Sequence, residues 1–190
     1  MFNSTININE NYFYMPFGPV ILNPKEIGLK ATFFKNIYID NETGTKWRRC
    51  TLYNTGWGQS VGFERLPELE FNDLIKLVLL SNHETTKLSV QGEESNKYGA
   101  IAVIMERHIN ELIDFLSRNL ENDNLFGDEL YRHNLSLFCF DARASDTNGG
   151  IGTKSYEDVL NQYQKWRDIS VQVKEKIYND QSGDGSVIES

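Results

Sequence analysis

Three side chains between residues 141 and 146 are of types that enzymes use. Asp141, Arg143 and Asp146 follow the apolar run Leu135–Phe140, which we interpret as a buried strand. Functional side chains often lie where a strand of an α/β protein ends, so these three residues, with a histidine, would suit a small hydrolase or transferase. Solvated loops have the same composition, and the enzymatic interpretation is therefore kept as an alternative.

Two glycine-rich segments come close to phosphate-binding motifs. Residues 56–62 (GWGQSVG) miss the G-x-G-x-x-G spacing by one residue, and the following FERLP does not open a helix that could hold an anion. Residues 149–155 (GGIGTKS) follow a predicted strand and open a predicted helix, but Thr153 separates the last glycine from the lysine that a P-loop requires. Neither segment predicts nucleotide binding, and we expect no cofactor.

Metal ligands and activated nucleophiles are sparse. Only His108 is followed by a carboxylate three or four residues later, Glu111, and a single pair of this kind is ordinary on a helix surface. Cys50 and Cys139 would need a histidine brought close by the fold, and we expect both to be buried reduced thiols. We expect no metal site; the histidines of the chain are His83, His108 and His133.

The charge of the chain excludes one large class of function. The formal net charge is −8 and the pI is near 4.9, with 19 basic residues scattered among 27 acidic ones. A nucleic-acid backbone requires a basic stripe, and the cluster Lys46, Arg48 and Arg49 is too small to provide one. An acidic surface instead favours solubility, or a basic protein partner whose approach it would steer.

The sequence also predicts the surroundings of the protein. The N-terminal MFNSTININENYF lacks the basic and apolar regions of a secretory signal. The longest apolar runs, Leu77–Leu80 and Ala100–Met105, are too short to span a bilayer. We therefore expect a cytoplasmic protein that does not enter a membrane, and the many Asn, Ile and Lys residues suggest an AT-rich genome.

The segment Asn96–Leu120 has the strongest helical periodicity. At about 100° per residue, one third of the helical wheel is apolar, and charged residues take the opposite side. His108 and its neighbours could divide this segment into two helices. The predicted apolar stripe consists of Tyr98, Ile101, Ala102, Met105, Ile109, Leu112, Ile113, Leu116 and Leu120.

A hairpin precedes this helix. Lys30–Asp40 and Thr45–Asn54 are rich in β-branched and aromatic residues, and Asn41–Gly44 forms the turn between them, with Gly44 at a positive φ. Both faces of the second strand are mixed, which favours an edge position or a partly wet sheet. We expect Asn54–Gly62 to be a loop and the aromatic residues Tyr12, Phe13, Tyr14 and Phe17 to cover a core surface.

The remaining periodic segments give the fold class. Helices are predicted at about 70–81, 96–120 and 155–177, and a short strand at Thr85–Gln91. The sequence thus predicts one α+β domain over residues 1–178, an N-terminal β-hairpin or partial antiparallel sheet packed on three main helices. Residues 179–190 are glycine-, serine- and acid-rich, and we expect a disordered tail.

These features favour a non-catalytic, cytosolic protein-binding domain. Trp47, Arg48, Arg49 and Trp57 are of the types that anchor interfaces and are the predicted binding residues. In size and charge the chain resembles the small acidic immunity and antitoxin proteins of bacteria, which neutralise a toxin, usually by covering its active site. The resemblance implies a protein partner and involves no matched motif. The alternatives are the hydrolase or transferase above and a self-assembling structural or prophage protein.

Overall fold

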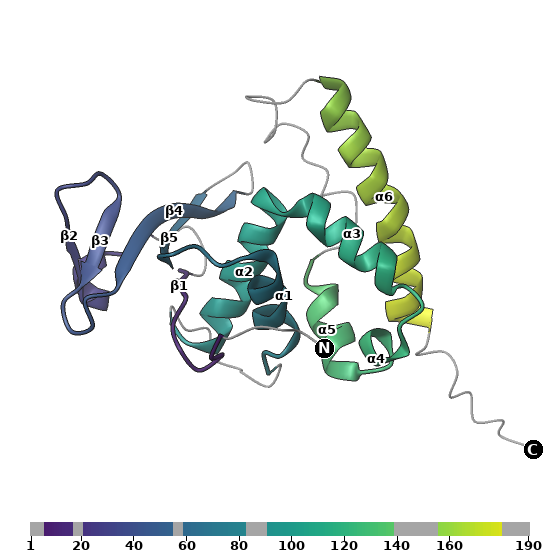
Figure 1. Ribbon diagram of the computed structural model, residues 1–190, viewed down its shortest axis with the longest axis horizontal. Coiled ribbons are helices and arrows are strands. Elements are labelled where there is room, and N and C mark those ends of the chain that lie inside the picture. The colour runs from purple at the N-terminus through teal and green to yellow at the C-terminus, as the bar shows by residue number, and fades with distance from the viewer. Residues whose placement is uncertain (1–5, 17–20, 55–58, 83–90, 139–155, 180–190) are drawn as a thin grey trace, which may run out of the picture. The chain divides into compact units, whose positions relative to one another are not determined.

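The computed structural model describes residues 6–16, 21–54, 59–82, 91–138 and 156–179. The chain divides into two compact units, Met1–Arg107 and His108–Ser190 (Figure 1). The first unit holds an antiparallel sheet and two helices, and the second is helical in its described part. The architecture is α+β, with the sheet at the N-terminus, as the sequence predicts. A single domain over residues 1–178 stays a prediction.

The sheet of the first unit has five strands in the order β1-β5-β4-β3-β2. All neighbouring strands are antiparallel, so the sheet is a meander except for β1, which joins it beside β5. The strands are β1 (Phe13–Tyr14), β2 (Leu29–Ala31), β3 (Ile37–Asp40), β4 (Lys46–Asn54) and β5 (Gln59–Arg65), and a short 3-10 helix, η1 (Pro24–Ile27), precedes β2.

Two expectations about the sheet are wrong. The segment Lys30–Asp40 is not one strand, because Thr32–Asn36 turn back and make β2 and β3 a hairpin of their own. β4 is the central strand rather than an edge, because Gln59–Gly62 belong to β5 and not to a loop. The other predicted explanation for the mixed faces of β4, a partly wet sheet, agrees with the structure, because Arg48 to Thr51 are all half-buried.

The turn Asn41–Gly44 forms as predicted. Gly44 has φ 72°, a conformation that side chains with a Cβ rarely adopt. Asp40 closes the turn, because its Oδ1 accepts hydrogen bonds from the backbone N–H groups of Glu42 (2.8 Å) and Thr43 (2.9 Å). The hydrogen bond from Thr43, with that from Glu42, lowers the pKa of the Asp40 carboxyl.

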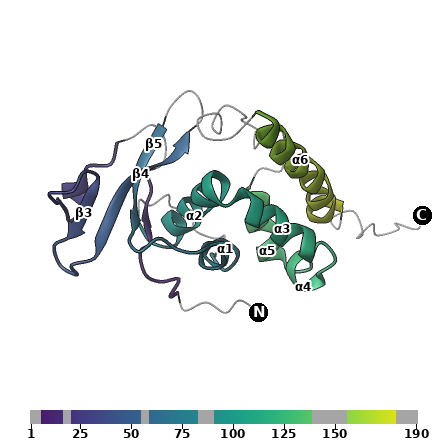
Figure 2. The ribbon, with the colours of Figure 1, turned by 45° about the horizontal axis from the view of Figure 1, so that its top comes forward.

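Each face of the sheet has its own apolar cover. On one face Tyr14 and Trp47 pack with ring centroids 4.5 Å apart, and Tyr38 meets Phe63 edge to face at 5.1 Å. This cluster also contains Leu22 and Leu29. Helices α1 (Phe71–Leu79) and α2 (Glu93–Arg107) lie side by side on the opposite face (Figure 2). Tyr12, Phe13 and Tyr14 are buried, which confirms their predicted role.

The start of α2 is joined to β1 by side chains. Asn96 Oδ1 accepts hydrogen bonds from the N–H groups of Tyr12 (2.8 Å) and Phe13 (3.1 Å), and its amide donates to Glu10 O (2.7 Å). Ser95 Oγ accepts from Met15 N (2.8 Å) and donates to Phe13 O (2.9 Å). These contacts satisfy the outer edge of β1, which would otherwise present unpaired backbone groups.

A glycine allows this helix to approach the strand. A Cβ on Gly99 would lie 2.3 Å from Cγ of Phe13, closer than carbon atoms approach in folded proteins. Gly99 is the seventh residue of α2 and lies in its second turn. It provides the space in which the Phe13 ring packs against α2.

The helical segment 96–120 is interrupted at His108, one of the two possibilities left open by the sequence. His108 has φ −123° and ψ 24°, and α3 (Ile109–Asn119) begins after it in the second unit. The predicted stripe holds in α3, where Leu112, Ile113 and Leu116 are buried. It is wrong in α2, where the buried apolar residues are Ala100, Val103 and Ile104 and the stripe residues are half-buried.

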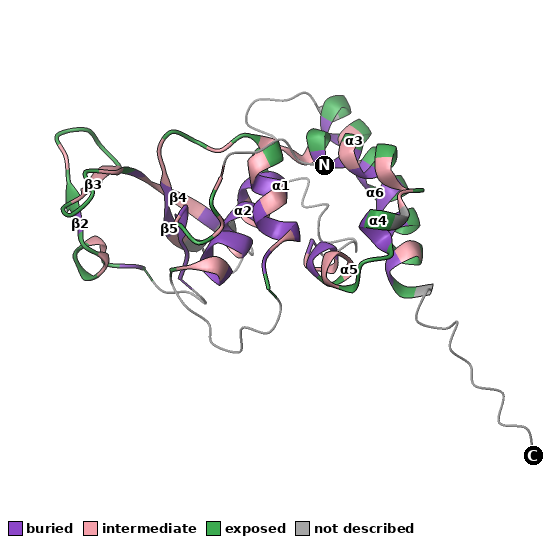
Figure 3. Ribbon diagram, turned by 60° about the horizontal axis from the view of Figure 1, so that its bottom comes forward, coloured by how far each residue is buried: buried purple, intermediate pink, exposed green. Residues whose placement is uncertain are grey.

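The second unit contains α3, α4 (Asp123–Phe126), α5 (Glu129–Ser136) and α6 (Tyr156–Asn179). The strand predicted at Leu135–Phe140 is wrong in its described part: Leu135 and Ser136 end α5, and Leu137 and Phe138 follow in a turn. Asp128 caps this helix by accepting a hydrogen bond from Tyr131 N at 3.0 Å. Helix α6 matches the third predicted helix, and Figure 3 shows its buried and exposed sides.

Other expectations cannot be compared with the structure. Phe17, the strand Thr85–Gln91 and the tail 179–190 lie outside the described residues, except for Gln91 and for Asn179, which ends α6. None of the helices that the structure does describe is long and apolar enough to cross a membrane.

We predict that Asn96→Ala lowers the free energy of unfolding of the first unit by about 2–4 kcal/mol, because it leaves buried backbone groups of β1 without partners. Urea unfolding followed by circular dichroism measures the change. Asn72→Ala, at an exposed position of α1, is the control and should change the free energy by less than about 0.5 kcal/mol. Equal effects of the two variants would contradict this role for Asn96.

Candidate functional site

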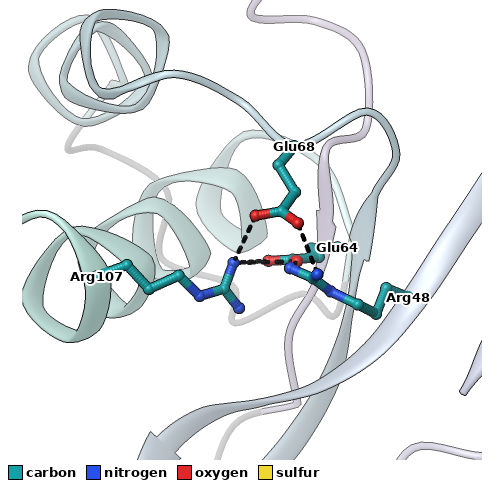
Figure 4. A network of polar contacts seen from close by, with 4 residues as sticks. All are labelled: Arg48, Glu64, Glu68 and Arg107. Carbon is teal, nitrogen blue, oxygen red and sulfur yellow. Dashed lines mark hydrogen bonds and ion pairs between the residues drawn. The ribbon is translucent and has the colours of Figure 1, made fainter. Parts of the chain in front are cut away.

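The most concentrated group of charges in the first unit surrounds Glu64 of β5 (Figure 4). Its side chain is 4% exposed and pairs with Arg48 of β4 and with Arg107, the last residue of α2, at 2.9 Å. Glu68 contacts the same two guanidinium groups from the solvent side, at 2.6 Å and 3.4 Å. Two carboxylates and two guanidinium groups therefore balance one another.

This network accounts for one predicted binding residue. Arg48 was expected to anchor a partner, but its guanidinium is held by Glu64 and Glu68. Register explains the contact, because Arg48 and Glu64 are directly opposite one another in the β4–β5 pair and their side chains share a face. The network therefore ties the sheet to the end of α2, and its charges are already paired within the unit.

The other predicted binding residues are dispersed. Trp47 is only 3% exposed and belongs to the aromatic cluster, so the expectation of an exposed tryptophan there is wrong. Alternation along β4 places Arg49 on the same face as Trp47, and Arg49 is half-buried. Trp57 lies outside the described residues. Trp47 and Arg49, the described members of this group, therefore do not form an exposed patch.

The residues of the enzymatic alternative, Asp141, Arg143 and Asp146, lie outside the part of the chain that the structure describes. Within the described part, no group of three or more His, Cys, Asp or Glu side chains could hold a metal ion. His108 and Glu111 form the predicted pair, with Nδ1 3.1 Å from Oε1. Burial acts to raise the pKa of the Glu111 carboxyl, but the His108 ring and the backbone N–H of Glu111 itself lower it overall.

Cys50 lies beside the Glu64 network and is a poor nucleophile. Burial raises the pKa of its thiol to about 11, although Arg107 and Arg48 act in the opposite direction. A thiol with this pKa is almost wholly protonated at neutral pH, and the thiolate is the reactive form. Burial therefore keeps Cys50 mainly in its less reactive thiol form.

Two polar residues at the start of α2, Ser95 and Lys97, have structural roles. Ser95 uses its hydroxyl to bind β1, as described above. Lys97 is 4% exposed and donates a hydrogen bond from Nζ to Asn82 O at 2.9 Å. Burial lowers the pKa of Lys97, and the nearby Glu93 and Glu94 oppose the shift.

A shallow polar cleft lies between α3 and α6 in the second unit. Gln162 and Asn110 bridge it with a side-chain hydrogen bond of 3.1 Å. A cleft that is this open to water and is lined by one carboxylate and one amine gives little selectivity for a ligand. Its lining residues are Asn110, Asp158, Asn161, Gln162 and Lys165.

The tip of the β2–β3 hairpin exposes two aromatic side chains. Phe33 is 98% exposed and Phe34 is 70% exposed, and the two rings meet edge to face with centroids 6.0 Å apart. Sequence reasoning missed them because it placed both residues inside one strand. The adjacent Lys35-Asn36 pair is a turn signal that could have divided the segment.

The tip is held in a defined conformation. Thr32 N donates to Ile37 O at 3.0 Å, and Ile37 N donates to Phe34 O at 3.2 Å. The Thr32 hydroxyl donates to Ile37 O (2.8 Å) and accepts from Phe34 N (3.2 Å), while Asn36 takes the left-handed conformation with φ 62°. Asparagine adopts this conformation more readily than most residues. The two phenylalanines therefore project from an ordered turn.

Comparison with known proteins gives no match. No protein family, curated protein or solved structure matches the chain. Among the described residues, the hairpin tip is an exposed apolar feature that the fold itself does not use.

We predict that Glu64→Gln destabilises the first unit by about 1–3 kcal/mol, because it leaves two partly buried guanidinium groups facing a neutral side chain. Glu68→Gln, which alters a 50% exposed carboxylate with the same two partners, should cost less than about 0.5 kcal/mol. Urea unfolding midpoints of the two variants measure the difference. A larger effect of Glu68→Gln would show that the outer carboxylate holds the network.

We also predict that Cys50 reacts slowly with iodoacetamide. In a Cys139→Ser background, alkylation at pH 8 should be at least about 100-fold slower than that of glutathione, because roughly 0.1% of a thiol with this raised pKa is ionised. The rate should rise as the pH is raised toward 10, and urea should abolish the protection. Alkylation at the glutathione rate in the folded protein would contradict the assignment.

Proposed function

We propose that this protein is a non-catalytic protein-binding domain and that the tip of the β2–β3 hairpin is its contact with a partner. The observation that supports the proposal is the exposure of Phe33 and Phe34 side by side on an ordered turn. Aromatic residues are enriched at protein interfaces, and those that fill a partner's pocket dominate the binding energy.

The free energy available at this tip is large enough to matter. Burying one phenylalanine side chain contributes about 1.5–3 kcal/mol, and both rings are largely in water here. The hydrogen bonds of Thr32 fix the turn before any partner arrives. An ordered contact loses less conformational entropy on binding, so more of the burial energy appears as affinity.

The hairpin also has a suitable shape for this role. β2 and β3 lie at the end of the sheet away from α1 and α2 (Figures 1 and 2), and the tip is a narrow projection from the first unit. A projection of this kind fits a concave surface, including an active site. An immunity- or antitoxin-type protein, which neutralises a partner by covering such a site, would use it in this way. A basic partner and a cytoplasmic location stay predictions from the net charge and the N-terminal sequence.

The proposal is tested with a photoreactive phenylalanine analogue placed at position 33 and, as a control, at position 171. Val171 is 52% exposed on α6 in the second unit. Irradiation in a lysate of the source organism should give one stoichiometric adduct with another protein at position 33 and none at position 171. Mass spectrometry identifies the adduct, and its absence at position 33 would contradict the proposal.

Affinity for the protein captured in this way provides the quantitative prediction. Phe33→Ser with Phe34→Ser should weaken binding at least about 30-fold, the loss of roughly 2 kcal/mol typical of an interface anchor. Val171→Ser with Tyr178→Ser removes two exposed apolar side chains elsewhere and should leave affinity unchanged. Titration calorimetry measures both, and circular dichroism checks that each variant is folded.

A further inference from the structure

The acidic charge of this protein is distributed unevenly. Residues 108–190 contain 15 acidic and 8 basic residues, whereas residues 1–107 contain 12 acidic and 11 basic ones. The β2–β3 hairpin, Leu29–Asp40, carries two lysines, Lys30 and Lys35, and one acidic residue, Asp40, which pairs with Leu29 at the end away from the tip. The proposed contact surface is therefore locally positive on a protein whose net charge is −8.

The two lysines flank the exposed rings. Lys35 follows Phe34 in the turn, and Lys30 lies in β2 opposite Ile39 of β3. Both lysines are exposed, and neither ammonium group has an ion-pair partner among the residues that the structure describes. The arginines of the same unit differ, since Arg65 pairs with Glu10 at 2.6 Å and Arg48 and Arg107 bind Glu64.

We infer that the hairpin recognises an apolar pocket rimmed by carboxylates on another protein; this inference rests on the proposed function. Phe33 and Phe34 enter the pocket, and the ammonium groups of Lys30 and Lys35 meet acidic side chains at its rim. Charges of this kind at the edge of an interface determine approach and register more than they add affinity, while burial of the rings supplies most of the binding energy.

A membrane surface fits the hairpin less well. Stable electrostatic attachment to anionic lipid requires a cluster of about four to eight basic residues, and this hairpin has two on an acidic protein. A second copy of the chain also fits poorly in a symmetric arrangement. Two hairpin tips that met about a two-fold axis would place the lysines of one copy beside those of the other.

The test reverses the charges of the hairpin and uses the protein captured through position 33 as the probe. Lys30→Glu with Lys35→Glu is compared with Lys165→Glu with Lys174→Glu, which makes the same change in net charge at exposed positions of α6. The hairpin variant should bind about 10- to 100-fold more weakly at low salt, and the difference should shrink as the salt concentration rises. The α6 variant should bind within about 2-fold of the unaltered protein.

A second measurement examines the rim directly. A zero-length carbodiimide coupling should join Lys30 or Lys35 to Asp or Glu residues that surround an apolar pocket of the captured protein. Equal weakening by the two charge reversals, or coupling only through other lysines, would overturn the acidic rim and leave the proposed function in place. No adduct at position 33 would remove both.

The other occupants are distinguished in the same series. Flotation with vesicles of phosphatidylcholine and phosphatidylglycerol at 3:1 that is lost in the Phe33→Ser, Phe34→Ser variant would overturn the inference in favour of a lipid surface. An adduct at position 33 with the mass of two copies of this chain would overturn it in favour of self-association.

Discussion

The hydrogen bonds between Asn96 and the strand β1 connect the two layers of the first unit. They fix the start of α2 against residues 12 and 13, and the absence of a Cβ on Gly99 lets the Phe13 ring fill the remaining space. At the other end of the same helix, Arg107 reaches Glu64 of β5. The helix is therefore attached to the sheet at both ends, and because β1 pairs with β5 and β5 with β4, the position of the whole sheet depends on these contacts.

The edge strand at the opposite end of the sheet is protected in a different way. The outer edge of β1 is satisfied by Asn96 and Ser95, whereas β2, the other edge strand, has only three residues and an exposed lysine at its centre. Short edge strands with lysine resist unwanted pairing with other chains. The edge of the sheet is thus protected from non-specific pairing, while Phe33 and Phe34 beside it leave two aromatic rings in water. This contrast supports a binding role for the two exposed phenylalanines.

The sequence predicts the class of the fold and most of its elements, but not the details that form the candidate site. Gly44, the aromatic residues 12–14 and the helices near 71–79 and 156–179 could be predicted because each depends on local conformation or periodicity. The strand expected at Leu135–Phe140 is wrong over its described residues, 135–138, because a short apolar run suits either structure, and the cap at Asp128 favours a helix. The stripe over 96–120 fails in α2 because the wheel assumes one continuous helix, and the break at His108 resets its phase.

Trp47 and Phe33 show why the contact residues could not be predicted from residue type. A tryptophan among arginines suggests an interface, and two phenylalanines in a β-rich segment suggest a core. The observed pairing of the strands contradicts both interpretations. Trp47 lies opposite Tyr38 of β3 and beside Tyr14 of β1. Its ring belongs to the buried cluster that also contains Leu22, Leu29 and Phe63. Phe33 lies in the turn between β2 and β3, where no neighbouring strand can cover it. Whether an aromatic side chain is buried depends here on which strands pair. The pairing depends on where the chain turns, and the turn at Thr32–Asn36 is not visible in the hydrophobicity pattern alone.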